Sequence, residues 1–307
     1  MMESNLRHRY TSWAATIPVI LSMAGACLFV TGASGQQPGG QHIERRLAVD
    51  ANASVKAFVP SGSVRIVAWD RDTIVVTGTI ADDGQFFFGG NKRGAKFGVE
   101  SASVGEEPGP AHLVIYVPAA SIVSIKCVSA DIDATNASGW FYTVDGNIRL
   151  RGSAREVQAE AMSGDINMTM SAPWVRMKTG SGALELGGHI ADAEASSITG
   201  RMLISATGLT RGKFGSVTGD VVFAAPLGEG GIFEFDDHSG SVELRLPSTT
   251  TGLFQLTTIG GIIDNGLTPL RPASAGTSHG QALAFRMGSG GARVTVRTFK
   301  GAIRLRH

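Results

Sequence analysis

The sequence predicts an all-β protein, a β-solenoid or β-helix-like stack of two-strand repeats of 18–21 residues, and two observations support this prediction. The first is a glycine-centred word that returns at nearly constant spacing. Its glycines are Gly146, Gly164, Gly182, Gly200, Gly219 and Gly240, and the intervals between them are 18, 18, 18, 19 and 21 residues. The second is an alternation of apolar and polar residues after each glycine, which is the two-residue period of a strand with one buried face.

The apolar positions recur in every copy of the word, and the position between them is mostly polar, with Leu203 and Val222 as the exceptions. The residues two and four positions after each glycine are apolar, namely Ile148, Ile166, Leu184, Met202, Val221 and Val242, then Leu150, Met168, Leu186, Ile204, Phe223 and Leu244. A second alternating segment precedes the glycine, as with Val157, Ala159 and Ala161 before Gly164. Two short strands cannot bury their own apolar face, so each repeat must stack on its copies. An antiparallel β-sandwich is the alternative, because sandwiches also place turns about every 8–12 residues.

The glycine of each word is expected at a corner of the coil, where the backbone turns or needs positive φ. Ser or Thr often precedes it and Asp or Asn often follows, and both kinds of residue form turns by bonding to nearby backbone.

Residues 1–35 have the layout of a secretory signal peptide. Arg7 and Arg9 give a basic start, residues 13–30 are mostly apolar, and small residues follow, so that cleavage after Ala33 or Gly35 suits the small-residue rule. We therefore expect an exported protein, located in the periplasm, on the cell surface or outside the cell.

Two alternatives apply to the same segment. Residues 13–30 are long enough to cross a bilayer, since about 20 residues span its core, and an uncleaved segment would anchor the chain in the inner membrane. A lipoprotein signal would instead end at Cys27.

The charge balance excludes some partners. The chain has 27 basic and 26 acidic residues, and without Arg7, Arg9 and Glu3 of the leader 25 of each remain. No basic surplus points to nucleic acid, and contact with a membrane is expected only through the N-terminal segment if it is uncleaved. Cys127 is then the single cysteine of the exported part, so no internal disulfide is expected, and its expected role is that of a small buried hydrophobe.

The rest of the chain divides by pattern. We expect residues 36–42 to form a flexible linker and residues 43–307 to form a single β-repeat domain. Within it we expect N-terminal coils at 43–128, regular repeats at 129–266, an excursion at 267–291 and a closing coil at 292–307. Arg293, Arg297, Arg304 and Arg306 give this last coil a basic face, as expected of a solvated terminal coil.

An insertion at 82–98 departs from the repeat. It carries Phe86, Phe87 and Phe88 followed by Lys92 and Arg93. The favoured interpretation is a hairpin whose phenylalanines cover the open end of the solenoid, because exposed sheet ends must be covered. The alternative is a loop through which these five residues contact a protein partner, a glycan or a membrane.

The opening coil and the repeated word resemble a known family. The segment from Val59 to Arg71, which reads Val-Pro-Ser-Gly-Ser-Val-Arg-Ile-Val-Ala-Trp-Asp-Arg, the Val-Val-Thr-Gly strand at 75–78 and the word Ser-Gly-(Asp/Ser)-(Ile/Val) are similar to a bacterial family of unknown function labelled "putative adhesin" with β-strand repeats. The similarity covers most of residues 54–305. It implies a β-solenoid-like envelope domain, and it carries over no catalytic residue. The departures are the insertion at 82–98 and the excursion.

The chain offers little for catalysis or metal binding. Lyases and hydrolases built on β-helices group acids on one face; here the densest acidic cluster is Asp236-Asp237-His238, which would need Glu185 or Glu243 in the same groove. No two histidines have the spacing of a zinc site, and neither a calcium-binding nonapeptide nor a phosphate-binding loop occurs. We therefore predict no catalytic, cofactor-binding or metal-binding residue.

The function predicted from the sequence is that of an exported, non-enzymatic cell-envelope protein, an adhesin or scaffold module. Its partner is expected to be an envelope component, a glycan or a protein, with self-association through the ends of the stack as a further mode. Two alternatives stay open: an envelope-stress sensor tethered by an uncleaved N-terminal helix, and a carbohydrate-active enzyme on the same scaffold.

Overall fold

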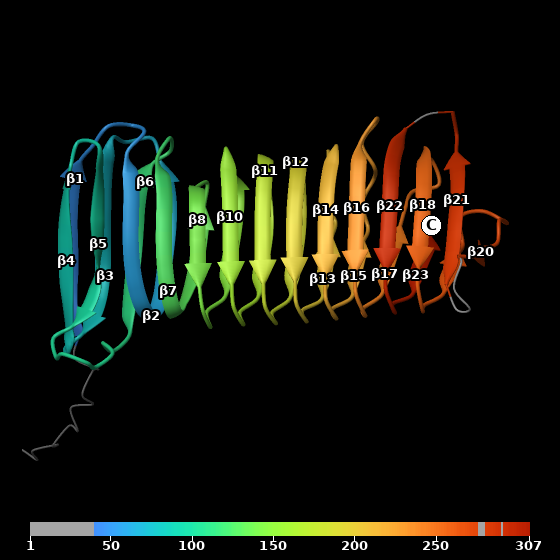
Figure 1. Ribbon diagram of the computed structural model, residues 1–307. Coiled ribbons are helices and arrows are strands. Elements are labelled where there is room, and N and C mark those ends of the chain that lie inside the picture. The colour runs from blue at the N-terminus through green and yellow to red at the C-terminus, as the bar shows by residue number, and fades with distance from the viewer. Residues whose placement is uncertain (1–39, 276–279, 290) are drawn as a thin grey trace, which may run out of the picture. The chain divides into compact units, whose positions relative to one another are not determined.

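The computed structural model describes residues 40–275, 280–289 and 291–307, in which every regular element is a β-strand. The predicted signal segment and residues 36–39 of the predicted linker lie outside the described residues. The described residues form coils that stack side by side (Figure 1).

Each coil contributes one strand to each of two sheets, which we call the A sheet and the B sheet. In spatial order, the shorter strands of the A sheet are β4 (Gly84–Asn91), β5 (Gly94–Ser101), β8 (Ser138–Thr143), β10 (Glu156–Ala161), β14 (Arg211–Ser216), β16 (Ile232–Asp237), β22 (Ala292–Thr298), β18 (Gly252–Thr258), β21 (Gln281–Met287) and β20 (Ala273–Ser274). Those of the B sheet are β1 (Gly40–Ala48), β3 (Thr73–Ala81), β6 (Ala111–Pro118), β9 (Ile148–Ser153), β13 (Met202–Ile204), β15 (Val221–Phe223), β17 (Val242–Arg245), β23 (Ile303–Arg306) and β19 (Ile263–Asn265).

Four long strands bend from one sheet into the other. They are β2 (Ser54–Trp69), β7 (Ile122–Thr135), β11 (Ile166–Thr179) and β12 (Leu184–Ser197). Both sheets are therefore one continuous hydrogen-bonded surface folded at two corners.

Parallel pairing at a constant offset confirms the predicted solenoid. Ile166 pairs with Ile148 on one side and with Leu184 on the other, 18 residues away in each direction. Among the described strands, antiparallel pairs occur only at the two ends, where β3 pairs with β1 and β6, β4 pairs with β5, and β21 pairs with β18 and β20. The β-sandwich alternative requires antiparallel hairpins throughout, and the centre of the stack has none.

The core lies between the two sheets and contains the residues that the alternation predicted. One column of the B sheet consists of Ile132, Ile148, Ile166, Leu184, Met202, Val221, Val242 and Ile303, all at most 1% exposed. In the A sheet, phenylalanines fill the later coils: the rings of Phe214 and Phe235 lie 5.3 Å apart, and both contact Phe223 of the opposite sheet. Stacking buries an apolar face that no single coil could bury.

The repeat glycines occupy one corner, as predicted, but positive φ is not the reason there. None of the six glycines of the repeat word has positive φ. Instead the backbones of successive coils approach so closely that a Cβ on Gly164 would overlap the carbonyl oxygen of Gly146. A buried hydroxyl completes the corner: Thr179 Oγ1 accepts a hydrogen bond from the Gly182 amide at 3.1 Å and donates one to the Gly164 carbonyl at 3.2 Å.

Replacing a corner glycine is therefore expected to destabilise the stack far more than replacing a glycine on an open edge. For Gly164→Ala we expect a loss of about 3 kcal/mol or more in the free energy of unfolding, because backbone must move. Gly89→Ala is the matched control, since nothing lies within 4 Å of a Cβ there. Urea unfolding measures both; equal stabilities of the two variants would contradict the close approach.

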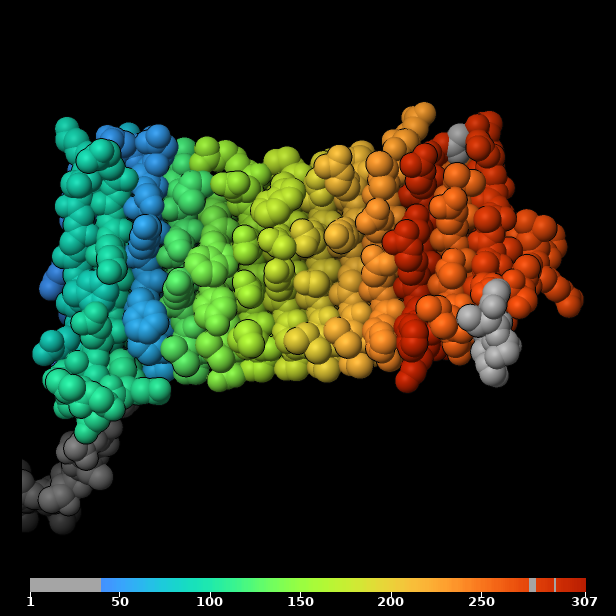
Figure 2. Space-filling model, in the orientation of Figure 1, coloured from blue at the N-terminus to red at the C-terminus, as the bar shows by residue number. Residues whose placement is uncertain are grey.

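The last coil in sequence is not the last coil in space. Strand β22 pairs in parallel with β16 on one side and with β18 on the other, and β23 lies between β17 and β19 in the same way. The chain thus leaves one coil position empty after residue 245, forms the coil that contains β18 and β19, returns through β21, and fills the gap with residues 292–306. Figure 2 shows this coil as a red band between orange neighbours.

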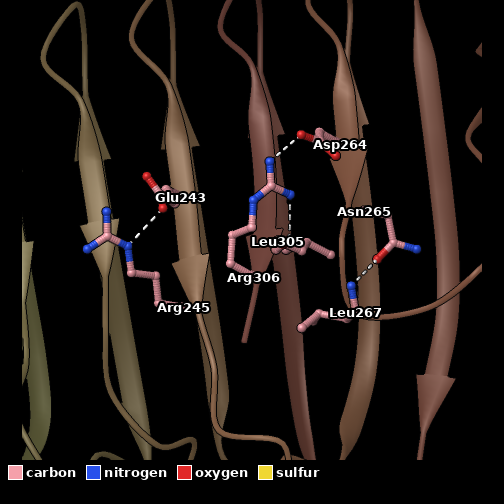
Figure 3. A network of polar contacts seen from close by, with 7 residues as sticks. All are labelled: Glu243, Arg245, Asp264, Asn265, Leu267, Leu305 and Arg306. Atoms are coloured by element: carbon pink, nitrogen blue, oxygen red, sulfur yellow. Dashed lines mark hydrogen bonds and ion pairs between the residues drawn. The ribbon is translucent and has the colours of Figure 1, made fainter.

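The expectation that the arginines of this coil decorate a solvated terminus is therefore wrong. Two of them pair with acidic residues of the adjoining coils: Arg297 with Asp236 at 3.7 Å, and Arg306 with Asp264 (Figure 3). The hydrogen bond from Arg306 holds the pKa of the Asp264 carboxyl below its usual value. These ion pairs bind the inserted coil to its neighbours on both outer faces.

Candidate functional site

The insertion at 82–98 forms the greater part of the β4–β5 hairpin, which lies at the N-terminal end of the stack. Phe86 and Phe88 turn inward onto Phe97, with ring centroids 6.2 and 5.6 Å from it, and cover the first coil. Phe87 turns outward beside Lys96, whose Nζ lies 6.0 Å from the ring centre. Lys92 and Arg93 are exposed in the turn of the hairpin. The five predicted contact residues therefore do not form one surface: two cover the core, one lies on the outer face of the sheet, and two lie in the turn.

If Phe88 covers the core, its loss costs stability, whereas the loss of Phe87 does not. We expect Phe88→Ala to lower the free energy of unfolding by about 1–3 kcal/mol, as befits a partly buried ring. Phe87→Ala, on the next residue of the same strand, is the control and should change it by less than about 1 kcal/mol. Thermal or urea unfolding of both variants measures the difference, and the reverse order would show that the cap is assigned to the wrong rings.

The residues of the acidic cluster at 236–238 point in different directions, because they alternate along a strand. Asp236 lies on the outer face and pairs with Arg297, whereas Asp237 points into the core and is only 6% exposed. His238 stacks on Phe299, with ring centroids 4.9 Å apart. The two acids therefore do not act on one substrate group from one side.

The proposed acidic partners lie on the other sheet. Glu185 accepts a hydrogen bond of 2.7 Å from Asn167, and Glu243 accepts one of 2.8 Å from Arg245 (Figure 3). The bond from Arg245 holds the pKa of the Glu243 carboxyl below its usual value. Both carboxylates are on the outer face of the B sheet, so the groove that a glycoside-cleaving site needs is not formed by these residues.

Asp237 occupies a place that hydroxyl residues take in other coils, such as Ser216 and Thr298 on either side of it. Neither of its carboxylate oxygens has a hydrogen-bond partner. Burial raises the pKa of Asp237 to about 7, and the amides of Gly240 and Ser239 lie near enough to oppose this rise without meeting hydrogen-bond geometry. The folded protein therefore holds a proton on Asp237 that the unfolded chain releases near pH 3.8.

This proton makes stability depend on pH with a definite sign. Between pH 4 and pH 7 the folded state binds more protons than the unfolded state, so the free energy of unfolding falls as pH rises. The variant Asp237→Thr has no carboxyl group at this position, so its free energy of unfolding should not fall in this way as pH rises. We expect it to exceed that of the native chain by about 1–3 kcal/mol at pH 8, and by progressively less toward pH 4. Urea unfolding at several pH values measures the difference, with Asp236→Asn as the control; a difference that does not change with pH would contradict the buried proton.

The thiol of Cys127 is not poised for chemistry. It is 1% exposed, and burial raises its pKa to about 12, so the thiolate that acts as nucleophile does not form at neutral pH.

The described ranges contain no cluster of three His, Cys, Asp or Glu side chains that could hold a metal ion. They also contain no helix that is long and apolar enough to span a membrane.

The outer face of the A sheet carries the feature that sequence reasoning missed. Over most of this face, charges of opposite sign lie next to one another in register, as where Arg176 binds Glu194 at 3.1 Å and Arg211 binds Asp192 at 3.1 Å. At the N-terminal end this rule fails, because Lys56 lies directly beside Lys96 of β5. Like charges in register destabilise a sheet, so fold stability does not explain this pair.

We call this region the lysine–aromatic patch. It consists of Lys56, Lys96 and Lys126 with Phe58, Phe87, Trp140 and Tyr142, all on the strands β4, β5, β2, β7 and β8. The three lysines are exposed, and none forms an ion pair with a described residue. Nζ of Lys126 lies 5.0 Å from the ring centre of Trp140, and a cavity of about 190 Å³ opens between Lys56, Lys96 and Lys126.

The three lysines lie about 30–40 residues apart in the chain, which is why the sequence did not reveal the patch. They lie close together in space only because β2 pairs in parallel with both β5 and β7. Of the predicted contact residues, Phe87 alone belongs to it.

Comparison with known proteins gives a family and a fold. A family described as Toastrack DUF4097 matches residues 50–306. Among solved structures, the chain is similar to a "putative adhesin" from Bacteroides fragilis, at 12% identity over 87% of this chain and 98% of the other, with a TM-score of 0.47. It is also similar to a "putative adhesin" from Parabacteroides merdae, at 11% identity over 86% and 96%, with a TM-score of 0.48. A "putative lipid binding protein" from Parabacteroides distasonis matches at 11% identity over 87% and 98%, with a TM-score of 0.46. No curated protein matches the chain.

Proposed function

The chain belongs to the Toastrack DUF4097 family, and from this premise we propose that it is an exported, non-enzymatic binding module of the bacterial cell envelope, an adhesin or scaffold. Such a module presents a rigid face to a partner and transforms nothing. The observation that carries the proposal is the lysine–aromatic patch, in which three cations without acidic partners lie among partly exposed rings on one continuous sheet.

The distribution of acids supports binding over catalysis. A carbohydrate-active enzyme on this scaffold needs Asp236, Asp237 and a partner such as Glu185 or Glu243 in one groove. Asp237 is buried in the core, and Glu185 and Glu243 lie on the sheet opposite to that of Asp236. Because opposed carboxylates act across one glycosidic bond, this arrangement favours the non-enzymatic role.

Envelope binding without degradation is the expected result. The chain recovered from the producing cells should bind their isolated envelopes in a saturable way, with heat-unfolded chain as the control. It should leave a panel of envelope and plant polysaccharides intact, as measured by released reducing ends. Release of oligosaccharide from any member of the panel would overturn the non-enzymatic role, and the absence of saturable binding would overturn the adhesin or scaffold role.

A tethered envelope-stress sensor is the second candidate, and one observation favours it. Six apolar side chains are more than a third exposed along the corner edge, namely Val128, Met162, Ile198, Val217, Phe299 and Ile259. The first described residue, Gly40, lies at the same edge, because Gly40 pairs with Ala81 and its neighbour Ile80 pairs with Ala111, which faces the corner residue Gly62. A retained segment 13–30 would tether the chain through Gly40, at the edge that carries these side chains. Recovery from the soluble fraction of a chain that starts near Ser34 or Gln36 would remove this candidate.

A further inference from the structure

The lysine–aromatic patch has an ordered pattern that specifies its ligand. In register across β5, β2, β7 and β8, one row reads Lys96, Lys56, Ser124 and Trp140. The next row, two residues further along each strand, reads Gly98, Phe58, Lys126 and Tyr142. The first row therefore places two adjacent cations two strands from a ring, and the second places one cation between two rings, along lines that cross the strands parallel to the axis of the stack.

We propose that this patch binds an extended acidic polysaccharide, a chain of sugars that carry carboxylate groups. This inference rests on the proposed binding function and names the class of its ligand. Neighbouring strands lie about 4.8 Å apart, a spacing close to the length of one pyranose unit. A linear glycan laid along the stack axis therefore meets one strand for each sugar.

Each side chain has a role in this arrangement. The ammonium groups of Lys56 and Lys96 bind carboxylates on successive sugars, and Ser124 of the same row offers a hydroxyl to the next. In the second row Lys126 lies between Phe58 and Tyr142, so that a carboxylate bound at Lys126 places the adjoining sugars over the two rings. Phe58 is 39% exposed, which is unusual for a phenylalanine with a core beneath it and leaves its ring open to a sugar face.

The boundaries of the patch fit a short segment of glycan. On the next strand, Glu160 stands beside Tyr142 and Lys178 beside Glu160, so the alternation of opposite charges resumes at β10. A carboxylate-bearing chain is repelled there. The bound segment thus extends from β5 to β8, across four neighbouring strands.

The same geometry disfavours a lipid as the ligand. The cavity between the lysines holds only about 190 Å³ and lies on an open sheet face, whereas the interior of the stack beneath it is filled by side chains such as Val55, Phe97 and Ile125, each at most 1% exposed. An acyl chain has no apolar channel to enter. A flat, polar, repeating polymer needs none.

The test uses the chain recovered from producing cells and three probes: oligogalacturonate, neutral dextran oligomers, and vesicles of phosphatidylglycerol. We expect saturable binding of oligogalacturonate that weakens with salt, as ionic contacts do, and no binding of dextran. The variant Lys56→Gln/Lys96→Gln/Lys126→Gln should lose about tenfold or more in affinity. The control Lys213→Gln/Arg286→Gln/Lys300→Gln removes the same charge from elsewhere in the stack and should bind as the native chain does. Unfolding midpoints no lower than that of the native chain will show that both variants remain folded.

The outcomes separate this inference from the function on which it rests. Binding to phosphatidylglycerol vesicles but not to oligogalacturonate, or equal loss in the two triple variants, would overturn the acidic-glycan site. If the chain still bound isolated envelopes in that case, the proposed function would stand and only its ligand would be wrong. A chain that bound neither envelopes nor oligogalacturonate would overturn both.

Discussion

The close approach of backbones at the glycine corner is the constraint on which the structure depends. Successive coils come so near that a Cβ on Gly164 would meet the carbonyl of Gly146, and a buried hydroxyl, that of Thr179, bridges the next pair of coils between Gly164 and Gly182. Because each corner repeats the last, both sheets keep one register over the whole centre of the stack. The alignment of outer side chains into rows, on which any binding surface here relies, follows from this contact.

The sequence predicted the architecture of the centre well, because periodicity there reflects stacking directly. The glycine spacing gave the offset at which Ile148, Ile166 and Leu184 pair, and the alternation gave their burial. The sequence explained only in part why each corner requires glycine. It predicted a turn there, but it did not predict that a Cβ would overlap the backbone of the neighbouring coil. An overlap between layers depends on which segments become neighbours, and the local sequence holds no information about its distance.

Prediction failed where neighbours in space are distant in the chain. The insertion of the last coil between β16 and β18 breaks the rule that consecutive repeats stack consecutively, so Arg297 and Arg306 were assigned to a solvated end. The lysine–aromatic patch was missed for the same reason, because Lys56 joins Lys96 and Lys126 only through two separate pairings. Charge totals did not help, since a neutral chain can still place three cations together.

The position of the final coil also bears on how the chain is completed. Strands β16 and β18 are joined only when residues 292–298 lie between them, so this end of the stack cannot close before those residues have been synthesised. A chain made from its N-terminus can form the central coils one after another, but the coil that closes this end is made after the coil on its outer side. A product that ends early keeps two open strand edges of the kind that quality-control proteases and aggregation act upon. The fold thereby makes synthesis through residues 292–306 a condition of a closed surface.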